Sequence, residues 1–185
     1  MVGYIPVDIE RDERSTPNPS AIVKLHTLHS EIWLPQPLRE LFPFFADAYN
    51  LESLTPSWVK FNVLTPAPIE MRKGVLIDYR LKIHGFPVRW QSEITAWDPP
   101  HRFVDEQRRG PYRVWIHEHR FEEREGGTQM TDHVRYAVPG GALINALFVR
   151  RDVEQIWAYR SARLAELFGE RHIELPLLAL AGRRT

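Results

Sequence analysis

The sequence predicts an α+β fold in which a curved antiparallel sheet of about seven strands wraps around one long C-terminal helix. From residue 24 to residue 139, short runs of alternating apolar and polar residues are separated by Gly and Pro, as in strands joined by tight turns. Residues 142–168 then contain no Gly or Pro and repeat apolar residues at helical spacing. Because a helix with an apolar stripe must bury it, we expect this helix to pack on the sheet.

The expected elements are one strand, two short helices, six further strands and the long helix. The first strand spans 24–34, and the two short helices lie within 37–56, where Pro43 limits the first and Asp47 caps the second. The further strands are expected at 60–66, 74–85, 86–100, 101–107, 112–123 and 128–139. Residues 1–22 are charged and proline-bearing and form an N-terminal extension, residues 23–169 form the domain, and residues 170–185 form a C-terminal tail.

Composition restricts the classes of function. A chain of 185 residues holds one domain, and its 24 basic and 24 acidic residues cancel, so no net field draws nucleic acid or an anionic membrane. The absence of cysteine excludes disulfides and thiolate metal sites. No apolar run reaches the ~20 residues of a membrane helix, and the N-terminus lacks a signal-peptide pattern. We therefore expect a cytoplasmic protein with no nucleic-acid partner and no membrane insertion.

The run VWIHEHRF at residues 114–121 places two histidines among aromatic and branched residues. If it is a strand, its odd-numbered side chains point to one face and its even-numbered side chains to the other. Applied to the neighbouring strands, the same alternation predicts a face that mixes large apolar groups with a few polar ones, as expected of a small-molecule pocket. The residues predicted to line this pocket are Trp90, Phe103, Asp105, Gln107, Trp115, His117, His119, Met130, Asp132 and Tyr136 of the sheet and Ile156 of the helix.

The two histidines allow three interpretations besides the one in which they are exposed and have no special role. A His-X-His strand brings both imidazoles to one side with Cα atoms about 7 Å apart, near enough to bind one metal ion. Asp105 or Asp132 could supply a third ligand, but the spacing fixes neither of them. Carboxylates beside imidazoles could instead act as catalytic base and acid. In the third interpretation, Asp105, His117, His119 and Asp132 hydrogen-bond to one another across the strands as a buried polar lining. We adopt the third and assign no catalytic residue, no metal and no cofactor.

The stretch FVDEQRRGPYRVWIHEHRFEEREGGTQMTDHVRYAVPGG, at 103–141, together with the order of elements, resembles bacterial ligand-binding proteins of the SRPBCC superfamily. That superfamily includes START lipid-transfer domains, Bet v 1-like proteins and polyketide cyclases, and its fold is the helix-grip fold. The resemblance covers about residues 24–168. It implies a cavity beneath the C-terminal helix that binds a hydrophobic or aromatic small molecule, lipid-like or polyketide-like. It also leaves open a cyclase or aromatase that uses the Asp and His residues, or an interaction module of the Hsp90-activator kind.

Several apolar residues are not placed by this interpretation. Trp33 is out of phase with its strand and is expected on the outer face, covered by an extension or by another subunit. The tail sequence LPLLALAG, at 175–182, is expected to pack against the domain or against a partner in a homodimer. On the long helix, one of Trp157 and Tyr159 is expected to face the cavity, and the sequence does not say which.

Overall fold

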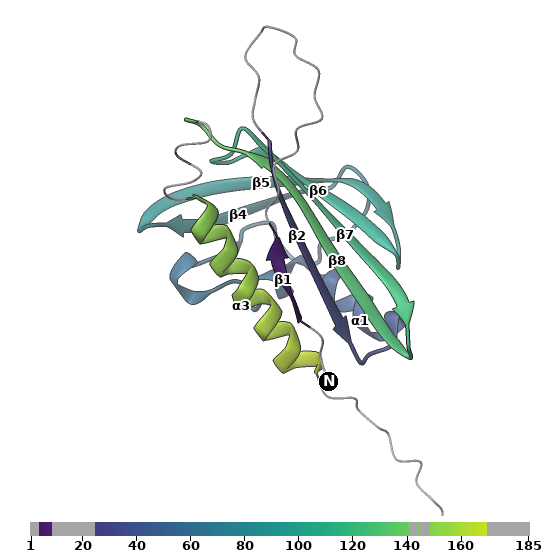
Figure 1. The fold of residues 1–185 in the computed structure, drawn as a ribbon. Coiled ribbons are helices and arrows are strands. Elements are labelled where there is room, and N and C mark those ends of the chain that lie inside the picture. The colour runs from purple at the N-terminus through teal and green to yellow at the C-terminus, as the bar shows by residue number, and fades with distance from the viewer. Residues whose placement is uncertain (1–3, 9–24, 141–143, 145–148, 170–185) are drawn as a thin grey trace, which may run out of the picture.

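The computed structural model describes residues 4–8, 25–140, 144 and 149–169, in which an antiparallel sheet curves around a long helix (Figure 1). The eight strands are ordered β1-β2-β8-β7-β6-β5-β4-β3. They are β1 (Tyr4–Asp8), β2 (His26–Leu34), β3 (Asn62–Val63), β4 (Leu76–Ile83), β5 (Phe86–Asp98), β6 (Arg102–Arg109), β7 (Val114–Arg124) and β8 (Gly127–Ala137). The helices are α1 (Leu38–Phe45), the 3-10 helices η1 (Ala48–Glu52) and η2 (Ser57–Val59), and α3 (Arg150–Phe168). The predicted α+β architecture is confirmed.

The sheet contains one strand more than expected, because Tyr4–Asp8 pairs with β2. This strand lies in the segment predicted as an extension outside the domain, and it corrects that expectation for these five residues. Pairing at a sheet edge uses backbone N–H and C=O groups, so it needs no apolar alternation that a sequence would display. The register shifts between Ile5 and Asp8, around Pro6, which has no N–H to donate.

Two hairpins of the sheet close through two-residue turns. His84 and Gly85 join β4 to β5 with φ of 49° and 83°, and Glu125 and Gly126 join β7 to β8 with φ of 53° and 72°. Positive φ at both turn positions gives the backbone twist that matches the twist of paired strands. The second turn therefore begins one residue before the Gly126–Gly127 turn expected from the sequence, and Gly127 belongs to β8.

Trp33 lies on the outer face of β2, as predicted, but the neighbouring hairpin supplies its cover. Its indole N–H donates to the carbonyl of Arg124 at 2.9 Å. A Cβ at Gly127 would lie 2.7 Å from the Trp33 ring and 2.4 Å from the carbonyl oxygen of Leu34. The close approach of Trp33 therefore requires glycine at the start of β8. The tail at 175–182, whose packing was also predicted, lies outside the described residues.

The segment between β2 and β3 closes one end of the sheet. The two predicted short helices are present, the second as the 3-10 helix η1, and Asp47 caps it by accepting a hydrogen bond from the N–H of Tyr49 at 2.9 Å. Pro43 lies inside α1 on its exposed side. On the buried side, Phe42 packs edge-on against Phe121 of β7, with ring centroids 5.6 Å apart.

Buried apolar side chains form two clusters, one at each end of the space between sheet and helix. The first gathers around α1 and includes Leu41, Phe121 and, from α3, Leu164. The second gathers around Trp115 and Trp157. Two partly buried residues, Trp90 and Ile156, pack against both clusters. The helix comes nearest to the sheet at β1 and β2 (Figure 1).

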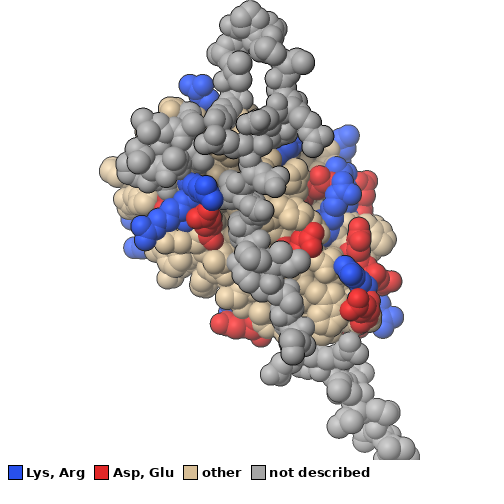
Figure 2. Space-filling view, viewed as in Figure 1, with Lys and Arg blue, Asp and Glu red and all other residues tan. Residues whose placement is uncertain are grey.

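The surface carries charges of both signs. Figure 2 shows positive and negative side chains interspersed over the described part of the face that carries α3, in keeping with equal numbers of basic and acidic residues. Among the helices described, none combines the length and the apolar character needed to cross a bilayer.

Candidate functional site

A cavity of about 630 Å³ lies between the concave face of the sheet, α3 and the segment that carries η1 and η2. This volume falls within the range of about 300–1,000 Å³ typical of small-molecule pockets. The walls are mostly apolar and aromatic, and they include Leu54, Val59, Ile77, Trp90, Trp115 and Trp157. The cavity is the space that remains because the helix meets the sheet at one edge.

The predicted parity of β7 is confirmed, since Trp115, His117, His119 and Phe121 are buried and the alternate side chains are more exposed. Seven of the eleven residues predicted to line the pocket do line the cavity. They are Trp90, Phe103, Asp105, Trp115, His117, His119 and Ile156. The strand alternation thus identified the correct face of the sheet.

The structure places the other four predicted lining residues, Gln107, Met130, Asp132 and Tyr136, away from the cavity. Gln107 holds the β6–β7 turn, because its side-chain amide donates to the carbonyl of Tyr112 at 2.7 Å. Met130, Asp132 and Tyr136 point inward from β8 but are covered by neighbouring side chains, with at most 4% of each residue exposed. Alternation predicts the face of the sheet on which a side chain lies but not how deeply it is buried. It therefore could not distinguish residues that line the cavity from residues of the apolar core.

The helix supplies lining residues that the sequence left open or missed. Trp157 faces the cavity, whereas Tyr159 contacts the exposed ring of Trp58. Arg160 also lines the cavity and is buried, with its guanidinium 4.8 Å from the centre of the Trp157 ring. Its position, three residues after Trp157 and four before Leu164, lies within the apolar stripe of the helix. That position was the signal from which its burial could have been inferred.

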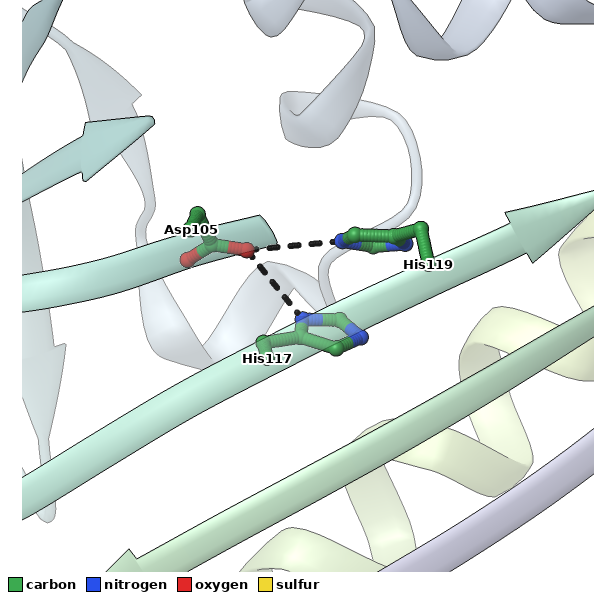
Figure 3. Close-up of side chains that lie close together, drawn as sticks. All are labelled: Asp105, His117 and His119. Atoms are coloured by element: carbon green, nitrogen blue, oxygen red, sulfur yellow. Dashed lines mark hydrogen bonds and ion pairs between the residues drawn. The ribbon is translucent and has the colours of Figure 1, made fainter. Parts of the chain in front are cut away.

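Four polar residues from three adjacent strands form a cluster at the floor of the cavity. The strand register sets Asp105 of β6 opposite His117 of β7, and His119 of β7 opposite Asp132 of β8. Asp132 Oδ1 lies 2.9 Å from His117 Nε2 and 2.8 Å from His119 Nδ1. Asp105 Oδ2 lies 3.5 Å from His117 Nδ1 and 3.4 Å from His119 Nε2 (Figure 3). Each imidazole therefore stands between two carboxylates.

Aromatic and hydroxyl neighbours fix the cluster in place. The two imidazole rings lie 3.7 Å apart, and Phe103 stacks on His119 with centroids 4.1 Å apart. The indole N–H of Trp90 donates to Ser92 Oγ at 3.0 Å, and the Ser92 hydroxyl donates to Asp105 Oδ1 at 3.4 Å. These contacts restrict rotation of the side chains, so the cluster is ordered before anything binds.

Burial and mutual charge determine the protonation of the cluster. Burial disfavours the ionised form of both aspartates, but the nearby histidines outweigh it and hold the pKa of Asp105 and of Asp132 below the usual range. For His119, burial lowers the pKa but the two carboxylates outweigh it, so its pKa is raised. For His117, burial and the charge of His119 prevail, so its pKa is lowered. The cluster can accept and donate hydrogen bonds at one place in an otherwise apolar cavity.

Comparison with known proteins agrees with this fold. The family model described as polyketide cyclase / dehydrase and lipid transport matches residues 34–158, which is more than half of the chain. The chain belongs to this family. The resemblance to the SRPBCC superfamily is thereby confirmed. None of the curated proteins compared with the chain matches it.

Solved structures share the fold at low sequence identity. Protein Ms6760 from Mycobacterium smegmatis is 21% identical with a TM-score of 0.61, over 88% of this chain and 97% of that one. Protein CV1439 from Chromobacterium violaceum is 15% identical with a TM-score of 0.62, over 78% of this chain and 98% of that one. Ara h 8.0201 is 17% identical with a TM-score of 0.56, over 77% of this chain and 97% of that one. Similarity at this level shows the helix-grip fold and does not identify a ligand.

Proposed function

We propose that this protein binds a hydrophobic or aromatic small molecule, lipid-like or polyketide-like, in the cavity beneath α3. The observation that carries the proposal is a cavity of about 630 Å³ with apolar, aromatic walls and one polar cluster at its floor. Such a pocket buries the body of a guest in apolar surroundings while a few polar groups orient it. Membership of a family described by polyketide cyclisation and lipid transport supports the same class of guest.

A guest of this kind is expected to stabilise the fold measurably. Ligand at about 100 times its dissociation constant adds about 2.7 kcal/mol to the free energy of unfolding. In a domain of this size that amount raises Tm by roughly 5–10 °C. A thermal-shift panel of fatty acids, phospholipids and planar polyketide-like aromatics, followed by calorimetric titration of the compounds that respond, therefore tests the proposal.

Two tryptophan substitutions on α3 provide a matched pair for this test. Ile156 lines the cavity, whereas Leu167 lies near the end of the same helix and is 39% exposed. Ile156→Trp should narrow the cavity and reduce the thermal shift, and Leu167→Trp should leave the shift unchanged. The proposal fails if no compound stabilises the wild-type protein, or if both variants respond to a compound as the wild type does.

A cyclase or aromatase activity is the second candidate, and the specific observation in its favour is that Asp105 and His119 both line the cavity. A carboxylate there could remove a proton beside a substrate carbonyl, and an imidazole could return a proton to oxygen as the ring closes. With a reactive poly-β-ketone mimic as substrate, His119→Gln should then lose the cyclised product while it still binds an unreactive guest. Equal product from wild type, variant and buffer would exclude this activity.

A further inference from the structure

Three side chains able to ligate a metal meet at the cavity floor, although only two of them share a strand. The ligand atoms of Asp105, His117 and His119 all lie within 4.8 Å of one another (Figure 3). The sequence supplied the two histidines and left the third ligand open between Asp105 and Asp132. The register of β6 against β7 sets Asp105 opposite His117. We propose that these three residues bind one divalent transition-metal ion, with zinc as the best-fitting member, and that a free coordination position of the ion opens into the cavity.

The position of Asp132 decides which ring nitrogens are available as ligands. Its Oδ1 faces the far nitrogen of each imidazole, at 2.9 Å from His117 Nε2 and 2.8 Å from His119 Nδ1. A carboxylate only accepts hydrogen bonds, so the favoured neutral tautomer of His117 carries its hydrogen on Nε2, which is hydrogen-bonded to Asp132. The near nitrogen of His117 then presents a lone pair toward Asp105 Oδ2, and His119 Nε2 faces the same oxygen. A cation between these three atoms would take the place of the hydrogen that His119 Nε2 shares with Asp105 Oδ2.

The distances favour a metal ion over a shared proton. A charged N–H···O hydrogen bond is about 2.7–2.9 Å long, whereas Asp105 Oδ2 lies 3.5 Å and 3.4 Å from the two imidazole nitrogens. Ligands about 2.0–2.1 Å from a tetrahedral zinc ion are about 3.3–3.4 Å from one another. Both contacts of Asp105 are therefore close to the spacing of a metal site. The two ring nitrogens lie at most 4.8 Å apart, so one ring must move closer to the other when the ion binds.

The surrounding groups resemble the outer shell of a metal site. Histidine ligands usually donate their second N–H to a carboxylate, which fixes the tautomer and raises the basicity of the ligand atom. Asp132 does this for His117, whose Nε2 is hydrogen-bonded to Asp132 Oδ1 at 2.9 Å. The hydroxyl of Ser92 donates to Asp105 Oδ1, the oxygen that does not face the imidazoles. The ligand donor set, two imidazoles and one carboxylate, suits zinc and the neighbouring first-row metals.

Arg160 favours an anionic group in the free coordination position. This buried guanidinium interacts electrostatically with both Asp105 and Asp132. Two carboxylates, a divalent ion and one guanidinium, with neutral imidazoles, leave one positive charge at the cavity floor. The carboxylate or enolate oxygen of a guest would neutralise that charge. This last step rests on the proposed function, whereas the ion site itself requires no guest.

The test uses the full chain, freed of metal with a chelator and then titrated with Zn²⁺ and, separately, with Co²⁺. We expect one equivalent of zinc per chain by calorimetry and by elemental analysis after dialysis. Co²⁺ should give the intense visible absorption of four-coordinate cobalt. Asp105→Asn and His119→Gln should each weaken binding by at least about 100-fold, and Asp132→Asn, which alters only the outer shell, by about 10–100-fold.

His133→Gln serves as the control, because His133 lies on the outer face of the sheet, where its ring is 6.4 Å from that of His29. This variant should bind zinc and cobalt like the wild type. The proposal is overturned if the wild type binds no stoichiometric ion, if Asp105→Asn and His119→Gln bind it unchanged, or if His133→Gln loses it. Because the wild-type titration is decisive alone, unfolding of a variant does not obscure the result. Guest binding measured with chelator present tests the proposed function separately.

Discussion

Replacing Asp132 by Asn tests whether the buried polar cluster stabilises the fold. Asp132 is only 4% exposed, and its Oδ1 faces both imidazoles at 2.9 Å and 2.8 Å. Asparagine keeps the shape of the side chain but removes its charge and replaces one acceptor oxygen by a donor. In the presence of a chelator, so that no ion contributes, we expect Asp132→Asn to lower the free energy of unfolding.

The size of the effect follows from burial. Removing one partner of a buried charged pair costs about 3–5 kcal/mol. Asp132 contacts two histidines of which neither is more than 9% exposed as a side chain, so solvent cannot replace the lost contact. At about 3 °C per kcal/mol for a domain of this size, Tm should fall by about 10–15 °C.

The measurement is urea and thermal unfolding at pH 7, followed by tryptophan fluorescence. Asp98→Asn is the matched control, because Asp98 also lies 2.9 Å from a basic side chain, Arg102, but is 65% exposed. Exposed pairs contribute about 0–1 kcal/mol, so this control should unfold almost like the wild type. If Asp132→Asn unfolds within about 1 kcal/mol of the wild type, the reasoning that links the buried cluster to stability is refuted.

The same comparison has a defined dependence on pH. The pKa of Asp132 in the folded state lies below its value in the unfolded chain, chiefly because the two histidines outweigh the effect of burial. The stabilisation by Asp132 is therefore present above the unfolded pKa of about 4 and is lost as pH falls through the folded pKa. The stability difference between wild type and Asp132→Asn should be present at pH 7 and shrink below about pH 4.

Three further changes test other parts of the structure. Burial raises the pKa of Tyr79 above its unfolded value. The wild type should therefore lose stability as pH rises above about 10, where the tyrosine ionises in the unfolded chain only. Tyr79→Phe should lose less stability over the same range in urea unfolding. The imidazole of His84 lies 2.7 Å from Asp152, and both residues line the cavity. Removing this contact by His84→Ala should speed guest release in stopped-flow experiments and change the free energy of unfolding by less than about 1 kcal/mol. An unchanged release rate would show that this contact does not retain the guest. A Cβ at Gly127 would clash with the carbonyl oxygen of Leu34. Gly127→Ala should therefore lower the free energy of unfolding by about 1–3 kcal/mol, measured in urea. If the variant is as stable as the wild type, β8 can shift to accept the added methyl group.

The sequence was most informative where one periodic pattern determines burial. The alternation through 114–121 places Trp115 and both histidines inward, and the structure agrees. Strict alternation fails on β5, where the register shifts between Ile94 and Ala96. Trp97 consequently pairs with Phe103 and packs against its ring, with centroids 5.7 Å apart. A bulge of this kind has no distinctive composition, so alternation alone could not locate it.

The candidate site depends on how neighbouring strands pair, which the sequence of a single strand does not show. Strand register sets Asp105 opposite His117, and the register of two strands depends on the geometry of the turn between them as well as on their residue pattern. A shift of one residue would have moved Asp105 to the outer face. The burial of Arg160 was easier to infer from its place in the helical stripe, but charged residues are so rarely buried that the pattern is usually interpreted as solvent-exposed.

The division of the apolar interior into two clusters has a consequence for cooperativity. Trp90 and Ile156 pack against both clusters and also line the cavity between them. In the empty protein these two partly buried residues connect the clusters, so we expect each cluster to open with some independence and hydrogen exchange to resolve two levels of protection. A bound guest would contact both clusters at once and connect them. We expect the loaded protein to exchange as one unit.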